Sequence, residues 1–134
     1  MADKVFWSVN VEVQNGPKYA RTQALDVEAF EKIQVSVPGE DPTTAGKPGK
    51  ASIAMLPTGS VAQFLLITSD KFDPEKLTYK VPGNSTDFVL DGPHMLAGGA
   101  IAMLGQPKKV DISNNMGKGN DATITIVLGR DATP

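Results

Sequence analysis

Cysteine is absent from the 134 residues of this chain, and histidine and tryptophan each occur once. Without cysteine the chain has no disulfide, no thiolate metal ligand and no thiol nucleophile. A single histidine also excludes metal motifs that need two imidazole ligands, such as His-Glu-x-x-His. Disulfide scaffolds, zinc-thiolate proteins and cysteine enzymes are therefore excluded. The absence of cysteine does not indicate whether the protein works in an oxidising or a reducing compartment.

The chain also lacks a long hydrophobic run. Its longest stretch without a polar side chain covers the ten residues 95–104, about half the length that a helix needs to cross a bilayer. The first residues pass directly into a strand pattern, without the basic and apolar regions of an export signal. We expect no signal peptide, no transmembrane segment and no membrane partner, and a cytoplasmic or virion-associated location.

Positive charge is not in excess. Thirteen Lys and Arg stand against fifteen Asp and Glu, giving a net charge of −2. Proteins that bind nucleic acid concentrate Lys and Arg on one face, but here the basic residues are scattered and Lys108-Lys109 is the only adjacent pair. We expect no nucleic-acid partner.

Glycine and proline, in contrast, are frequent. The 13 Gly and 10 Pro cluster between short apolar segments, which is the punctuation of many short strands joined by turns. The length fits a single domain, residues 1–134. The pattern predicts an all-β fold, an antiparallel two-sheet sandwich resembling a jelly roll with about eight or nine strands.

The clearest strand lies at the start of the chain, where apolar and polar residues alternate from Val5 to Val13. This alternation predicts one buried face that includes Trp7. Asn15-Gly16 then predicts a tight hairpin, followed by an extended segment over 19–25. Residues 26–32 also fit a short helical turn, but the continued alternation to Val37 favours a strand.

The remaining segments are short and separated by loops. A long loop rich in Pro and Gly covers 38–50, and a second, rich in Asn and Gly, covers 113–121. Further strands are expected over 51–56, 61–68, 77–81, 88–90, 110–112 and 122–128.

The apolar run 95–104 predicts a contact between subunits. As a strand it would leave a second apolar face in need of a cover. Pro93 and Gly105 also fit the ends of a helix, although adjacent glycines would destabilise it, and we favour the strand. In either form the small residues let another backbone approach. The predicted oligomer interface is Met95, Ala97, Gly98, Gly99, Ala100, Ile101 and Met103.

Catalytic, cofactor and metal sites are not expected. His94 is flanked by a turn and an apolar segment, which do not resemble a nucleophile elbow. The carboxylates, including Asp70 and Asp73, have spacings that turns explain, although a calcium site built from these two is chemically reasonable. No phosphate-binding glycine motif occurs between a strand and a helix.

These observations favour a non-enzymatic structural or interaction protein that forms a symmetric homo-oligomer, such as a virion or shell component. A small-ligand or carbohydrate-binding module using the loops 38–50 and 113–121 is the alternative. A hydrolase using carboxylates or His94 ranks third, and a concave pocket holding His94 against a carboxylate would support it.

Overall fold

The computed structural model of the chain describes residues 3–56, 60–73, 75–82, 86–105 and 108–132. Within these ranges lie ten strands and one short 3-10 helix. The elements are β1 (Asp3–Glu12), β2 (Lys18–Val27), β3 (Ala29–Val37), β4 (Gly49–Ala54), β5 (Ser60–Ser69), β6 (Leu77–Lys80), β7 (Asp87–Val89), β8 (His94–Ala97), η1 (Gly98–Leu104), β9 (Lys109–Asn114) and β10 (Ala122–Ala132). No helix in these ranges is long and apolar enough to cross a membrane.

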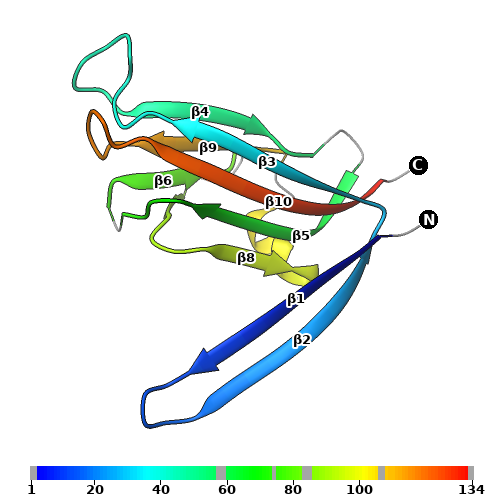
Figure 1. Cartoon of the computed structure of the whole chain (residues 1–134). Helices are drawn as coiled ribbons and strands as arrows, with labels where there is room; N and C mark the ends of the chain where they lie inside the picture. Colours follow the sequence, from blue (N-terminus) through cyan, green and yellow to red (C-terminus); the bar gives the residue numbers. More distant parts are fainter. Residues whose placement is uncertain (1–2, 57–59, 74, 83–85, 106–107, 133–134) are drawn as a thin grey trace.

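The eight strands from β3 to β10 form a rolled-up antiparallel ribbon (Figure 1). The first pairs with the last, β3 with β10, and the pairing continues inward through β4 with β9 and β5 with β8 to β6 with β7. The ribbon folds into two four-stranded sheets, ordered β3-β10-β5-β8 and β4-β9-β6-β7. This nested pairing is the jelly-roll topology, so the predicted sandwich class is confirmed.

The core lies between these two sheets because each strand alternates apolar and polar side chains. In β10 the apolar side chains of Ile124, Ile126 and Leu128 are fully buried. Thr125 and Val127, which alternate with them, lie on the other face of the sheet and are half-buried. Asn114 is the one fully buried polar side chain among the described residues. Its amide group donates to the carbonyl oxygens of Val37 and Asn120 and accepts from an amide N–H. Burial of this side chain is therefore compensated by hydrogen bonds.

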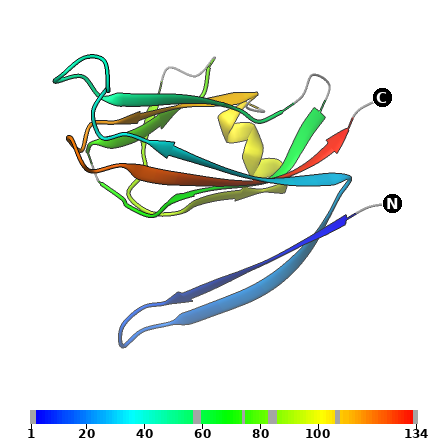
Figure 2. The same ribbon diagram turned by 45° about the horizontal axis from the view of Figure 1, so that its top comes forward.

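Strands β1 and β2 form a separate hairpin, which we call the arm (residues 3–27). It projects away from the sandwich (Figure 2). The two strands pair over ten positions, from Asp3 with Val27 to Glu12 with Lys18. Asn15 adopts a left-handed conformation with φ 58° at the tip. The hairpin predicted from Asn-Gly is present, but residues 13–17 join its strands, which is a longer connection than the predicted tight turn.

The arm corrects one prediction and confirms another. The alternating face of the first strand does not enter the core, since Val11 and Val13 remain 50% and 53% exposed. Alternation reports one apolar face but not what covers it. The region that also fitted a helical turn is extended, in β2 and β3, and that strand prediction is correct.

The apolar run divides into a strand and a helix. Residues 95–97 lie in β8, whereas 98–104 form η1, so the strand prediction is wrong for the second part. The change occurs at Gly98, whose φ of +60° ends the strand, and η1 stops at Gly105, with φ +69°. Ile101 and Leu104 are buried against the core, which is why this helix forms despite its adjacent glycines.

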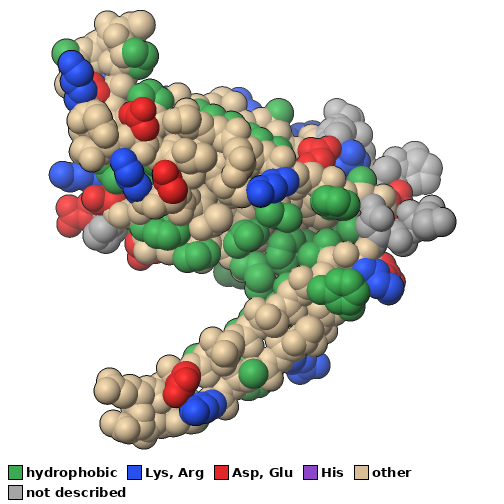
Figure 3. Space-filling model, viewed as in Figure 1, with side chains coloured by type: hydrophobic (Ala, Val, Ile, Leu, Met, Phe, Trp, Pro, Cys, Tyr) green, Lys and Arg blue, Asp and Glu red, His purple; other side chains and the backbone are tan. Residues whose placement is uncertain are grey.

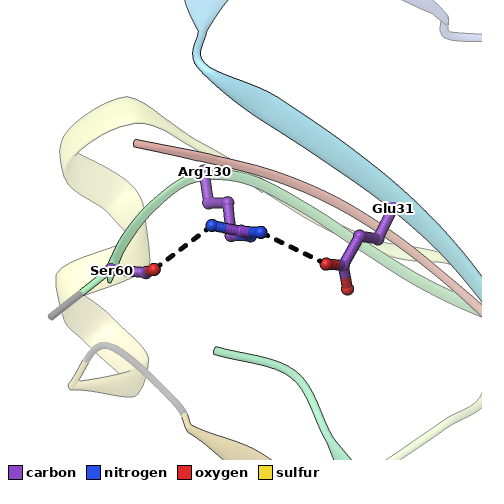
Figure 4. A network of polar contacts seen from close by, with 3 residues as sticks. All are labelled: Glu31, Ser60 and Arg130. Carbon is purple, nitrogen blue, oxygen red and sulfur yellow. Dashed lines mark hydrogen bonds and ion pairs between the residues drawn. The ribbon is translucent and has the colours of Figure 1, made fainter. Parts of the chain in front are cut away.

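A partly exposed ion pair lies near the base of the arm. The Arg130 guanidinium is 3.4 Å from Glu31 Oε1 and donates to Ser60 Oγ at 3.3 Å (Figure 4). These contacts connect β3, β5 and β10 close to the point where the arm begins.

Candidate interaction surface

One face of the arm is apolar, and we call it the arm stripe. Directly paired residues of an antiparallel hairpin share a face. Val5 pairs with Leu25, Val9 with Arg21, and Val11 with Tyr19. The apolar members of this face are Val5, Trp7, Val9, Val11, Tyr19 and Leu25.

The arm stripe packs on the sandwich at its base. Gly129 of β10 has no side chain, and a Cβ built there would lie 3.0 Å from Val27 Cγ1 and 3.3 Å from Val5 Cγ2. Toward the tip, exposure increases until Val11 and Tyr19 are 50% and 54% exposed. The stripe is therefore packed at one end and open to solvent at the other.

The outer face of the β3-β10-β5-β8 sheet is also apolar next to the arm. Val127 pairs with Leu66, and Leu66 pairs with Met95, so these side chains form one row across three strands. Ala97 lies in the neighbouring row, beside Phe64. We call the half-buried residues Leu66, Met95, Ala97 and Val127 the sheet patch. Figure 3 shows apolar side chains gathered on the sandwich where the arm leaves it, with an open notch between the two.

The outer face of the other sheet has the opposite character. A shallow depression there is lined mainly by charged or hydroxyl side chains, including Lys50, Ser52, Lys80, Asp111 and Ser113. The polar side chains of this face can form hydrogen bonds with water, whereas the apolar side chains of the arm stripe and the sheet patch cannot. The arm stripe and the sheet patch are thus two apolar surfaces on the side of the molecule that carries the arm. Phe6, Phe72 and Met103 are further exposed apolar side chains outside them.

The structure separates the residues predicted at the oligomer interface. Met95 and Ala97 belong to the sheet patch, but Ile101 is fully buried in the core. Gly98, Gly99, Ala100 and Met103 lie on η1, where Met103 is 76% exposed. Whether these residues contact a second subunit remains a prediction.

The arm stripe was missed by sequence reasoning because its alternation is typical of a core strand. A signal was nevertheless present in the second strand of the hairpin. Arg21 and Gln23 lie opposite Val9 and Trp7, and polar residues at those positions do not fit a fully buried face.

His94 lies at a cavity between the edges of the two sheets. The cavity has a volume of about 400 Å³ and is lined by Tyr79, Phe88, Pro93, His94, Met95, Leu96, Met103 and Leu104. Tyr79 Oη is 2.7 Å from His94 Nδ1. Asp91 Oδ1 is 3.6 Å from His94 Nε2. The pocket and carboxylate that a His94-dependent hydrolase needs are therefore both present.

Tyr79, which contacts His94 in this cavity, is a weak nucleophile. Burial raises the pKa of Tyr79 to about 12, so the phenol keeps its proton at neutral pH. With Nε2 facing the Asp91 carboxylate, the network places the imidazole proton on Nε2 and makes Nδ1 the acceptor from Tyr79. This arrangement orders the sheet edge, but it does not generate a reactive oxygen at neutral pH.

The two long loops do meet at one end of the sandwich. Their cavity of about 320 Å³ is lined by residues that include Glu40, Asp41, Lys118 and Asp121. Hydrogen bonds from Thr43 lower the pKa of Asp41. Asp121 accepts from the Gly39 amide at 3.3 Å. At least two of these carboxylates therefore hold the loops in place.

The carboxylates considered for calcium also bind backbone amides. Asp70 accepts from the Thr123 N–H at 2.8 Å, and Asp73 accepts from two successive amides at 2.8 Å each. No group of three or more metal-ligating side chains is found in the part of the chain that the structure describes.

No known family model matches this chain, and no curated protein matches it either. Its classification therefore rests on the fold, a jelly roll that carries an N-terminal hairpin arm.

Proposed function

We propose that this protein is a non-enzymatic structural subunit that self-assembles into a symmetric homo-oligomer, such as a virion or shell component. One observation carries the proposal. The arm extends an apolar stripe away from the sandwich, and the end of that stripe near the tip, at Val11 and Tyr19, is about half exposed.

The energetics support this proposal. An isolated two-stranded hairpin is marginally stable in water, and burial of apolar surface contributes about 25 cal/mol per Å². Val11 and Tyr19, each about half exposed, contribute little of this stabilisation in a single molecule. A neighbouring subunit that covered them would stabilise the arm and the assembly together.

The fold is compatible with this role. Jelly rolls occur in viral capsid and lectin domains, but the same architecture serves unrelated functions, so the fold alone does not define this one.

Sedimentation velocity and light scattering of the purified chain test the proposal. Over a range from about 1 to about 100 µM, which covers typical weak to moderate affinities, we expect particles whose mass is a multiple of 14.2 kDa. A single species of 14.2 kDa throughout this range would contradict self-assembly.

A second candidate function is the binding of a small apolar ligand in the cavity at His94. Its volume of about 400 Å³ and its aromatic and aliphatic lining with one polar pair are typical of small-molecule sites. A titration with a naphthalene-type fluorescent probe tests this, with Leu96→Lys as the variant expected to abolish binding. Binding that is unchanged in this variant would place the probe elsewhere.

A further inference from the structure

We infer that the arm of a second copy of this chain occupies the notch, and that two copies exchange arms reciprocally. Each arm stripe would lie on the sheet patch of its partner. This inference rests on the proposed self-assembly, and it identifies the surfaces that make the contact.

The base of the arm is fixed, and this disfavours closure of the arm onto its own sheet. The Glu28 N–H donates to the Arg130 carbonyl at 3.0 Å and to Asp131 Oδ1 at 3.2 Å. Val27 is almost completely buried and packs with Val5 over Gly129. Folding the arm down would break these contacts at the position where the chain turns from β2 into β3.

The charges of the arm favour a neutral partner. Lys4 and Asp26 form an ion pair of 2.7 Å, and Lys18 and Glu12 form another of 3.4 Å. All four residues lie on the face opposite the arm stripe. Arg21 lies on the face of the arm stripe itself, opposite Val9. Residues 3–27 contain three cations and three anions, so the arm has no net charge to attract a phosphate backbone or an anionic lipid surface. The apolar members of the stripe match the apolar sheet patch of another copy.

The size of the surfaces explains why the exchange is reciprocal. A strand of ten residues is about 33 Å long, and two strands are about 10 Å wide, so one face of the arm covers roughly 330 Å². A stable interface buries about 800 Å² on each partner. One arm on one sheet is therefore too small. With two exchanged arms, each copy contributes both a stripe and a patch, which doubles the area buried on each partner.

Engineered cysteines test this contact directly, because the natural chain has none. One preparation carries Val9→Cys on the arm stripe, and a second, with a different affinity tag, carries Val127→Cys on the sheet patch. After mixing, the two are joined with a short bismaleimide. We expect a product that contains both tags, formed about a hundredfold faster than random collision at about 10 µM protein allows, because the contact raises the local concentration to about 1 mM.

Two matched controls set the background for this reaction. Asn10→Cys places the thiol on the opposite face of the same arm, and Ser52→Cys places it on the outer face of the polar sheet. Replacing Val9→Cys by Asn10→Cys, or Val127→Cys by Ser52→Cys, should return the cross-linking rate to that of random collision. Equal rates in all combinations would overturn the arm contact.

A chain carrying both Val9→Cys and Val127→Cys distinguishes exchange from closure. In a dilute sample, an internally cross-linked monomer as the main product would show that the arm covers its own sheet and would overturn the inference. Products of two chains support it.

The charge variants Val11→Glu and Asn10→Glu separate this inference from the proposed function. Val11→Glu should weaken assembly about a hundredfold, with Asn10→Glu close to the natural chain. Circular dichroism should show both variants folded, because neither side chain lies in the core. If the natural chain is monomeric, both proposals fail. If it assembles and Val11→Glu assembles equally well, only the arm contact is wrong.

Discussion

Tyr79 Oη lies 2.7 Å from His94 Nδ1, and this hydrogen bond joins the two sheets of the sandwich at their edge. Tyr79 belongs to β6 and His94 to β8, which are in different sheets. The tyrosine ring also stacks on Phe88 with a centroid distance of 5.3 Å. The pair thus connects the edge strand of one sheet to the aromatic packing of the other.

Removing the hydroxyl of Tyr79 should destabilise the fold modestly. Tyr79→Phe keeps the stacking on Phe88 but leaves His94 Nδ1 without this donor. We expect the free energy of unfolding to fall by about 1 kcal/mol, the usual net contribution of one hydrogen bond. Urea unfolding measures this, and an unchanged midpoint would show that solvent replaces the bond without cost.

The same side chain predicts a dependence of stability on alkaline pH. Burial raises the pKa of Tyr79 from 10.0 to about 12, so between these values the unfolded chain loses the phenolic proton while the folded chain keeps it. The stabilisation is complete below pH 10 and is lost as the pH rises towards about 12, by up to about 1.4 kcal/mol per pH unit. The difference in unfolding free energy between the natural chain and Tyr79→Phe isolates this effect from lysine titration. A difference that stays constant above pH 10 would contradict the prediction.

Trp7 offers a direct optical measure of the arm contact. It is the only tryptophan, and it lies on the arm stripe, paired with Gln23. If the stripe becomes covered on assembly, the emission maximum of Trp7 should shift to shorter wavelength as the protein concentration increases. This shift should follow the mass measured by light scattering and should be absent in Val11→Glu. Assembly without any spectral change would place the contact away from the arm.

Much of the sandwich could be predicted because alternation and turn residues act locally. Ile124, Ile126 and Leu128 alternate with threonines or valine, and a strand with one buried face is the only regular structure that fits this period. The arm could not be assigned in the same way. Val9 and Val11 obey the same rule as the core strand, and only the three-dimensional path of the chain shows that Val11 stays half exposed.

The other failures also arise from information that is not local. The division of the run 95–104 depends on the positive φ of Gly98, which a glycine permits but does not require. The contact between Tyr79 and His94 depends on the nested pairing of β5 with β8 and β6 with β7, which fixes where the two sheet edges meet. The residues of β6, which carries Tyr79, do not predict where β8 lies, and the residues of β8, which carries His94, do not predict where β6 lies.

The glycines of η1 test the interface predicted from the apolar run. A Cβ at Gly99 would have no neighbour within 4 Å, whereas Gly98 has a φ of +60°. Gly99→Leu should therefore fold with nearly natural stability and weaken assembly, if η1 takes part in the contact. Gly98→Leu should in addition lose about 1–2 kcal/mol through backbone strain. Mass measurements and thermal unfolding on both variants check this, and a natural mass for Gly99→Leu would remove η1 from the interface.

Gly129 lies against the base of the arm, and we expect a side chain at this position to change the direction of the arm. A Cβ there would meet Val27, Val5 and Phe64 at 3.0 to 3.4 Å, so the larger side chain of Gly129→Val must displace the arm base from β10. We expect a loss of about 1–3 kcal/mol in unfolding free energy, typical of overpacking. The displaced arm would no longer place its stripe against the sheet patch of a partner, so assembly should weaken by more than this stability loss explains. Gly92→Ala is the matched control, since a Cβ there would touch nothing within 4 Å. If Gly129→Val assembles like the natural chain, the arm does not need a fixed base.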